Sequence, residues 1–178
     1  DQKPVIEDTP VTGNVLTDGT PDSDPDIIPL TVTGFTVDTN NDGTPESFTA
    51  GQSATIPGVG TMTIRAHGGY TFTPAANYTG AIPLVTYTVS DGQGGTDTST
   101  LQLSMVPVND PPAANPDAYS TPENTPVAIP LQANDTDPDG DKLTVTAVNG
   151  QPDLSLRARQ GGLDDAWVER AGRAGGVA

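Results

Sequence analysis

The sequence predicts an all-β protein, a Greek-key β-sandwich with one complete domain and an incomplete second repeat. Short segments alternate apolar and polar residues with the period of two that marks half-buried strands. Turn residues separate these segments, among 20 glycines and 18 prolines, and no helical pattern precedes residue 153. About seven such segments in roughly 105 residues have the spacing of an antiparallel sandwich.

The first strand region begins at Glu7–Val11 and ends near Val15-Leu16. An acidic loop, Asp22–Asp26, follows it. The next strand is Leu30–Val37, whose apolar residues stand at positions 30, 32, 35 and 37. The apolar positions change parity at Gly34, which predicts a β-bulge there.

The middle of the chain predicts shorter strands. Ser47–Ile56 and Gly60–Ile64 are separated by a Pro-Gly turn. Tyr70–Thr73 alternates after the turn Ala66–Gly69, which is the pattern of a hairpin. The chain then crosses to Ile82–Ser90.

A final hairpin closes the first domain. Tyr87 and Val89 alternate with polar residues, a Gly-rich turn follows, and Leu101–Met105 alternates again. The second strand of this hairpin leads into Asn109–Pro112, a stiff acidic connector. We therefore expect a domain boundary at the connector.

Beyond the connector the sequence repeats three short blocks in the same order. The offset is 116 for the first block and 113 for the other two, so a deletion of three residues separates them. A repeat of this length indicates tandem domains. The pairs are Glu7–Val11 with Glu123–Val127, Asp22–Asp26 with Asp135–Asp139, and Leu30–Thr33 with Leu143–Thr146.

The second copy does not continue. After Gly150 nothing matches the later hairpins, and the remaining residues are rich in Arg, Ala and Gly. This tail is either a truncation, frameshift or vector-derived end, or a genuine docking tail; Leu163–Arg170 could form a short helix. We expect a first domain over residues 1–109, part of a second repeat over 110–152 and a loosely structured tail over 153–178. Without its later strands, the second copy cannot bury its sheet.

Charge and composition exclude several functions. Residues 1–150 hold 19 acidic and three basic side chains, a net charge of −16, whereas residues 151–178 hold four of each. Such a charge repels nucleic acid and anionic lipid and attracts cations. The chain has no cysteine, so disulfides and cysteine-based zinc sites are excluded. No apolar run is long enough to span a membrane, and we expect any export signal to lie outside this fragment.

The sequence offers no catalytic constellation, so we do not expect an enzyme. The one histidine, His67, stands in a tight turn beside Gly68-Gly69, where a solvated side chain is the usual reading. No serine elbow, zinc motif or phosphate loop is present. The many carboxylates lack an apolar cleft that would separate their pKa values for acid–base work.

Clustered carboxylates favour cation binding. Asp135, Asp137, Asp139 and Asp141 alternate over seven residues. Two carboxylates about 4 Å apart repel by roughly 4 kcal/mol at an effective dielectric constant of about 20, so an ordered cluster needs a cation. Ca²⁺ suits such oxygen ligands. The alternative is a solvated acidic loop, but oxygen-bearing side chains recur at other strand ends, as the acids Asp24, Asp26, Asp91 and Asp110 and the amide Asn109.

A weaker metal motif follows the second predicted strand. Asp38, Asn40 and Asp42 match the first half of an EF-hand loop, but Thr49 stands where a bidentate Glu is needed. A plain Asn-Asp-Gly turn fits equally well. Two N-x-Thr sequons, at Asn77 and Asn134, carry no further inference.

Together these motifs resemble the cadherin-like tandem repeats of large bacterial surface proteins, including repeats-in-toxin-type and biofilm-associated adhesins and VCBS-type repeats. The resemblance covers residues 1–150. The segments that carry it are Gly69–Pro74, Asn77–Gly80, Tyr87–Gly92, Gly94–Asp97, Val108–Pro112 and Asn134–Asp141.

In cadherins, calcium lies at the junctions between domains, and the resemblance implies ligands here. Asn109 and Asp110 resemble the connector ligands, Asp137 and Asp139 those of the following domain, and Glu7 the acidic residue of the first strand. Asp24, Asp26 and Asp91 would face an upstream junction, and Glu123 a downstream one. The middle cadherin motif is not recognisable, nor is a second Ser-Asp-Gly.

The resemblance implies a calcium-stiffened extender repeat of a secreted bacterial adhesin, located at the cell surface and supporting adhesion or biofilm. Its partners would be neighbouring repeats, with surface glycans or proteins bound through other domains. The alternative is a sandwich whose loops bind a carbohydrate or protein. Exposed aromatic residues would favour that alternative, but Tyr70, Phe72 and Tyr87 stand at alternating, core-like positions.

Overall fold

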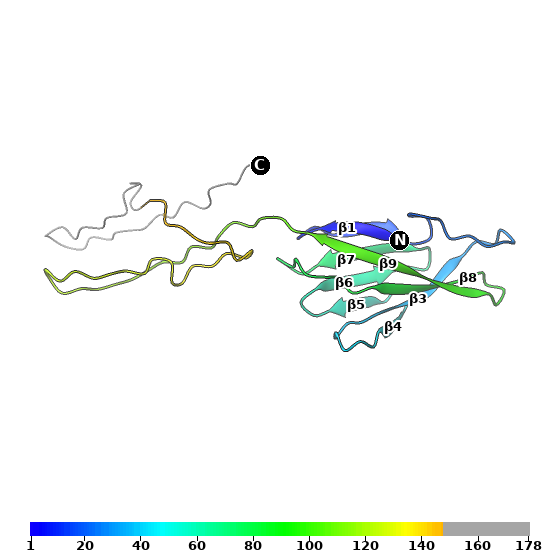
Figure 1. The fold of residues 1–178 in the computed structure, drawn as a ribbon. Coiled ribbons are helices and arrows are strands. Elements are labelled where there is room, and N and C mark those ends of the chain that lie inside the picture. Colours follow the sequence, from blue (N-terminus) through cyan, green and yellow to red (C-terminus); the bar gives the residue numbers. More distant parts are fainter. Residues whose placement is uncertain (148–178) are drawn as a thin grey trace. The chain divides into compact units, whose positions relative to one another are not determined.

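The computed structural model describes residues 1–147 (Figure 1). The chain divides into two compact units, Asp1–Val108 and Asn109–Ala178, which are described separately below. We call them unit 1 and unit 2. The predicted tail over 153–178, its possible helix at Leu163–Arg170 and the end of the second repeat near residue 152 lie outside the described residues.

Unit 1 is built from nine β-strands, and residues 1–147 contain no helix. The all-β prediction is therefore confirmed. The described part of the chain accordingly has no helix that could span a bilayer. The strands are β1 (Gln2–Ile6), β2 (Val11–Asn14), β3 (Thr31–Val37), β4 (Glu46–Thr49), β5 (Ser53–Ile56), β6 (Gly60–Ile64), β7 (Gly69–Pro74), β8 (Val85–Ser90) and β9 (Thr96–Val106).

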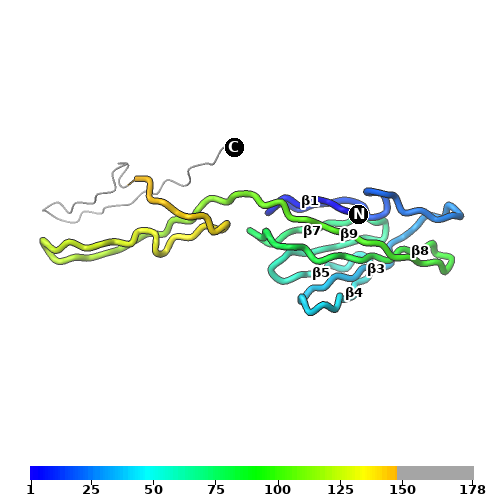
Figure 2. Tube along the Cα trace, viewed as in Figure 1, coloured from blue at the N-terminus to red at the C-terminus, as the bar shows by residue number. Residues whose placement is uncertain are grey.

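Two sheets form the predicted sandwich. One sheet has the order β1-β9-β8-β3-β4, and the other has the order β2-β7-β6-β5. All pairs are antiparallel except β1 with β9, which run parallel with Gln2 beside Gln102 and Ile6 beside Val106. Figure 2 shows β1 following β9 along the edge of the first sheet.

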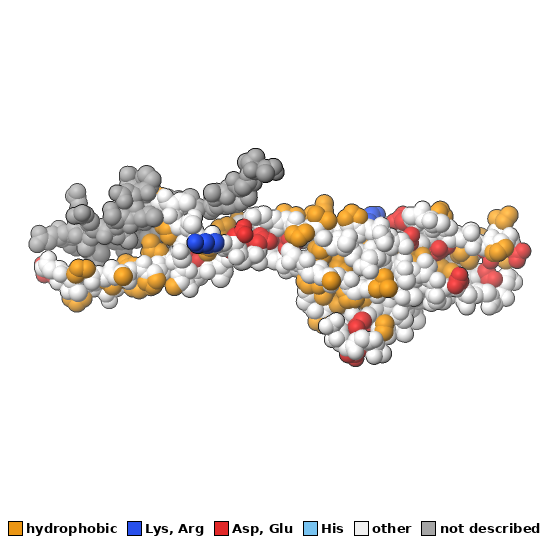
Figure 3. Space-filling view, viewed as in Figure 1, with side chains coloured by type: hydrophobic (Ala, Val, Ile, Leu, Met, Phe, Trp, Pro, Cys, Tyr) orange, Lys and Arg blue, Asp and Glu red, His pale blue; other side chains and the backbone are white. Residues whose placement is uncertain are grey.

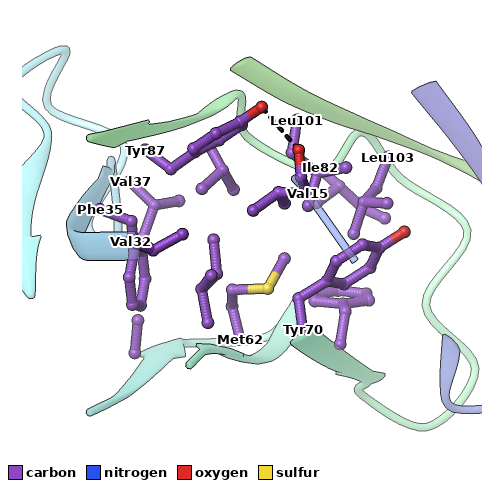
Figure 4. Packing of buried hydrophobic residues seen from close by; sticks show 14 of the residues in the cluster. Val15, Val32, Phe35, Val37, Met62, Tyr70, Ile82, Tyr87, Leu101 and Leu103 are labelled. Carbon is purple, nitrogen blue, oxygen red and sulfur yellow. Dashed lines mark hydrogen bonds between the residues drawn. The ribbon is translucent and has the colours of Figure 1, made fainter. Parts of the chain in front are cut away.

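The period of two in the sequence becomes the core between the sheets. In β6 and β8 every second residue is buried, because successive side chains of a strand point to opposite faces. Tyr70, Phe72 and Tyr87 are at most 2% exposed, so their core-like positions are confirmed. Figure 4 shows side chains of both sheets meeting in this interior.

The bulge predicted at Gly34 is present. The pairing of β3 with β8 shifts register between Val32 and Gly34. This shift turns Val32, Phe35 and Val37 to the same interior face, although their spacing is not strictly even. The extra residue therefore keeps the strand's apolar side chains inside the sandwich.

Two strand predictions need correction. The sequence gives no alternation at residues 2–6, yet β1 forms there, because its pairing with β9 supplies the hydrogen bonds. Ser47–Ile56 is not one strand. Gln52 donates its backbone N–H to the Thr49 carbonyl, and Gly51 has a φ of 90°, so the chain turns between β4 and β5 and enters the other sheet.

Unit 2 contains no buried residue between positions 109 and 147. An isolated antiparallel bridge joins Ala113 to Thr136, and Asn115 donates its backbone N–H to the Asp135 carboxylate at 3.0 Å. Local hydrogen bonds thus hold this stretch without a core.

Candidate calcium-binding residues

The acidic loop of unit 1 is an ordered turn. Asp24 Oδ1 accepts the backbone N–H of Asp26 at 2.7 Å, and the Asp24 carbonyl accepts the N–H of Ile27 at 3.0 Å. Ile27 has a φ of 62°, in the left-handed region. The Asp side chain therefore folds the loop back on itself as an Asx turn.

The acidic loop of unit 2 makes the same turn 113 residues later. Asp137 Oδ1 accepts the N–H of Asp139 at 3.0 Å, and the Asp137 carbonyl accepts the N–H of Gly140 at 3.1 Å. Gly140 has a φ of 74°. Asp137 Oδ1 also accepts the N–H of Asp141 at 3.1 Å. The sequence repeat is thus also a repeat of backbone geometry.

The structure brings Asp24 and Asp91 together in unit 1. Both line one hollow of about 280 Å³ beside the turn between β8 and β9. Asp91 Oδ1 accepts the backbone N–H groups of Gln93 and Gly95, at 2.7 and 2.9 Å, so the turn orients its carboxylate. Asp26 is not among the residues that line the hollow.

Two further carboxylates, Asp22 and Asp97, line the same hollow and were not singled out as ligands from the sequence. Asp22 Oδ2 lies 3.0 Å from the Tyr87 hydroxyl. The lining contains no Lys or Arg, so its charge is negative throughout. Figure 3 shows acidic side chains at this end of unit 1. The proximity of Asp97 follows from the β8–β9 pairing, which places it opposite Val89.

Glu7 lies just past β1, at the other end of unit 1. Its backbone N–H donates to the Val106 carbonyl at 3.1 Å, and its Oε2 accepts the N–H of Val108 at 2.8 Å. Glu7 is 3% exposed, and its Oε1 has no hydrogen-bond partner among residues 1–147. A buried carboxylate oxygen without a partner is costly, and a bound cation is one way to offset that cost.

Three predicted ligands are linked within unit 2. The backbone N–H of Asp110 donates to Asp139 Oδ2 at 2.7 Å, and Asp139 is joined to Asp137 by the Asx turn. Asn109 donates its side-chain amide to the Asp110 carbonyl at 3.0 Å. The acidic loop of unit 2 is therefore fastened to the connector. Glu123 is exposed and stands apart from this arrangement, in the turn Pro122–Thr125.

The loop with the partial EF-hand motif is closed by its own backbone. Asp38 Oδ2 accepts the N–H of Gly43, Asn40 Oδ1 that of Asp42, and Asp42 Oδ1 that of Thr44, at 2.9, 3.0 and 2.7 Å. These are the bonds of a plain turn. Asp38 Oδ1 is buried without a hydrogen bond.

Glu46 completes this loop and was not predicted from the sequence. Its Oε2 accepts the backbone N–H and the hydroxyl of Thr39, at 2.7 and 2.8 Å. The backbone bond, and then the hydroxyl bond, hold the pKa of Glu46 below its ordinary value. The carboxylate therefore closes the loop as a structural acceptor.

Comparison with family models decides which family these features belong to. Residues 1–107 match the model of the bacterial cadherin-like domain. The chain belongs to this family. Residues 109–166 match the model of the bacterial Ig domain, and a search of curated proteins gives no match. The resemblance inferred from the motifs is therefore confirmed.

Some general properties of these two domain families are relevant to this chain. Cadherin-like domains generally bind Ca²⁺, and the donor set here is carboxylate and amide oxygen, as Ca²⁺ requires. Bacterial cadherin-like and Ig domains occur in surface proteins and are typically non-catalytic structural modules. In this chain, the buried Oε1 of Glu7 makes no hydrogen bond within the described residues and is therefore suited to bind a cation.

Proposed function

We propose that this chain is a calcium-stiffened extender segment of a secreted bacterial adhesin. Two repeats in tandem, a sandwich fold and the family membership of unit 1 support an extender module. In this proposal the chain lies outside the cell, neighbouring repeats are its partners, and other domains of the full protein bind the adhesion target. Its contribution to biofilm is mechanical.

The observation that carries the calcium role is the buried carboxylate of Glu7. Its Oε2 is fixed by the N–H of Val108, and its Oε1 lacks a partner. Val108 is followed directly by Asn109 and Asp110, so these two oxygen donors lie within two residues of the backbone N–H that Glu7 accepts. A cation there would satisfy Oε1 and restrain the connector.

Ca²⁺ would supply charge neutralisation, and the residues of the chain would supply the oxygen ligands. We assign Glu7, Asn109, Asp110, Asp137 and Asp139 to the connector between the two repeats. Asp24, Asp26 and Asp91 would serve a junction upstream, and Glu123 one downstream. The loop with Asp38, Asn40 and Asp42 is a weaker candidate, because its own backbone engages these side chains.

A calcium titration followed by thermal melting tests this proposal. We expect Ca²⁺ to raise the melting temperature of the chain, since a ligand at about 100 times its dissociation constant stabilises the folded state by about 2.7 kcal/mol. Mg²⁺ at the same concentration should stabilise less, because it needs stricter octahedral geometry. A melting curve that Ca²⁺ leaves unchanged would contradict the proposed calcium role.

The variant Glu7→Gln identifies the site. It should keep or raise the stability measured in EDTA, because it removes a buried charge, and it should lose most of the stabilisation by Ca²⁺. Glu123→Gln is the matched control, since Glu123 is the repeat counterpart of Glu7 but is exposed. If both variants respond to Ca²⁺ like the parent chain, Glu7 is not a ligand.

The alternative function, binding of a carbohydrate or protein by the sandwich loops, has less support. It would need a face of exposed aromatic residues, but Tyr70, Phe72 and Tyr87 are buried in the core. Tyr119 of unit 2 is 46% exposed, and within residues 1–147 it stacks on no other aromatic ring. We therefore retain the extender as the proposal.

A further inference from the structure

Ile27 combines two features that are unusual for an isoleucine. Its side chain is 90% exposed, at the tip of the acidic loop of unit 1. Its φ of 62° lies in the left-handed region, which is strongly disfavoured for a β-branched residue. At the same position of the repeat, the second copy has Gly140, which adopts this conformation without strain. The apolar side chain of Ile27 is thus exposed to solvent at a position whose backbone conformation suits glycine.

Unit 1 has an apolar patch at its opposite end. Ile6 and Val106 are cross-strand neighbours on β1 and β9, and they are 54% and 43% exposed. Val108 lies two residues beyond the end of β9 and is a third exposed apolar residue here, at 46%. We call these three residues the pole patch.

The two features lie at opposite ends of the same strand. The acidic loop lines one hollow with the turn that precedes β9, whereas the pole patch lies where β9 ends. Figure 1 shows β9 running along unit 1 between these two ends. With 11 residues, β9 separates these ends by about 35 Å. A tip at one end and a patch at the other suit a head-to-tail contact between successive copies of one domain.

We propose that Ile27 docks on the pole patch of a preceding copy of the same repeat. This inference rests on the extender function proposed above and names the contact that would orient one repeat on the next. The stretch from Asn109 to Pro116, which precedes the counterpart of Asp1, spans at most about 28 Å, and this limits the distance between the ends of successive domains. Since Gly140 has no side chain, the second copy lacks such a tip, so position 27 would distinguish firmly docked repeats from loosely docked ones.

A protein with two copies of the repeat in tandem tests this contact, because its first copy supplies the pole patch and its second copy supplies Ile27. Residues 1–116 followed directly by residues 1–178 place a complete repeat upstream at the native spacing, because Asp117 corresponds to Asp1 at the offset of 116 that holds for the first block. The chain has no cysteine, so single cysteines report local exposure. Ile27→Cys is compared in the single chain and in the second copy of the tandem. Thr55→Cys, on the exposed face of β5, is the matched control.

We expect the cysteine at position 27 to react with a maleimide about tenfold more slowly in the tandem than in the single chain, which corresponds to about 1.4 kcal/mol of docking. The control at position 55 should change by less than about twofold. Equal rates at position 27 in the two proteins would overturn the proposal. So would protection in the single chain that grows with protein concentration, since this would indicate contact between separate molecules.

A second pair of variants keeps Ile27 native. Val108→Cys in the first copy should be protected when the second copy carries Ile27 and should become reactive when that copy carries Ile27→Gly. Measurements in EDTA and in Ca²⁺ separate the two proposals. Protection that persists without any effect of Ca²⁺ supports the Ile27 contact and contradicts the calcium role. A melting temperature that Ca²⁺ raises, with no protection of the cysteine, supports the calcium role and contradicts the Ile27 contact.

Discussion

Two buried tyrosines show how differently one residue type can contribute to this fold. The Tyr87 hydroxyl donates to the Val15 carbonyl at 2.9 Å (Figure 4). It also lies 3.0 Å from Asp22 Oδ2, so it joins the core to the acidic loop. The Tyr70 hydroxyl is also buried, but it has no hydrogen-bond partner in the part of the chain that the structure describes. A satisfied polar group stabilises the folded state, whereas an unsatisfied one costs free energy.

Removing each hydroxyl should therefore have opposite effects. We expect Tyr87→Phe to lower the free energy of unfolding by about 1–2 kcal/mol, because it leaves the Val15 carbonyl without its donor. Tyr70→Phe should leave stability unchanged or raise it by about 1 kcal/mol. Urea denaturation at pH 7 measures both, and each variant controls for the lost hydroxyl volume in the other. Equal losses would contradict the hydrogen bonds described here.

Tyr70 also makes the stability of the folded chain depend on pH in the alkaline range. Burial, and then the charge of Asp18, raises the pKa of Tyr70 to about 12 from its ordinary 10.0. Between these values the unfolded chain loses the proton first, so stability falls as pH rises through this window. In Tyr70→Phe the free energy of unfolding should fall less steeply between pH 10 and 12.

At the scale of the strands, the bulge at Gly34 was predictable and its cause is steric as well as hydrophobic. A Cβ at Gly34 would lie 2.7 Å from the Phe48 carbonyl oxygen on β4. The neighbouring rings of Phe35 and Phe48 stack with their centroids 5.3 Å apart. The strands therefore approach closely at the one residue without a side chain.

Substituting this glycine tests the close approach. Gly34→Ala should lower the free energy of unfolding by about 1–3 kcal/mol, because β3 and β4 must separate to admit the methyl group. Thr36→Ala, two residues along the same strand, should cost less than about 1 kcal/mol. Chemical denaturation of the two variants side by side gives both values. Equal small losses would mean that β4, an edge strand, moves without cost.

The other strand-scale predictions failed where pairing is not local. No pattern within residues 2–6 indicates a strand, since the partner of β1 lies about one hundred residues away on β9. The alternation through Ser47–Ile56 conceals a turn, because β4 and β5 keep the period of two on either side of it.

At the scale of the whole molecule, the core belongs to unit 1. All buried residues among positions 1–147 lie before Val108, and unit 2 contributes none. The last residue of unit 1 is also fastened within the unit, since Glu7 accepts the N–H of Val108. Folding should therefore depend on residues 1–108.

A fragment of residues 1–108 should unfold cooperatively in EDTA, with a melting temperature within a few degrees of that of the full chain. A fragment of residues 1–95 is the control and should not fold, because it lacks β9, which supplies Leu101 and Leu103 to the core. Circular dichroism during heating measures both. A broad transition for residues 1–108 would show that unit 2 contributes to the fold.

The sequence by itself determined the fold class, the tandem repeat and the acidic character, because each is expressed in local periodicity, local motifs or composition. It also pointed to Asp24 and Asp91, and to Asp110 with Asp139, as members of acidic sites. Only the tertiary structure decided that Glu7 is buried with one unpaired oxygen, that Asp22 and Asp97 share the hollow, and that Ile27 stands exposed and strained. These features depend on contacts between strands far apart in the chain, and on backbone angles at single residues, which no local pattern specifies.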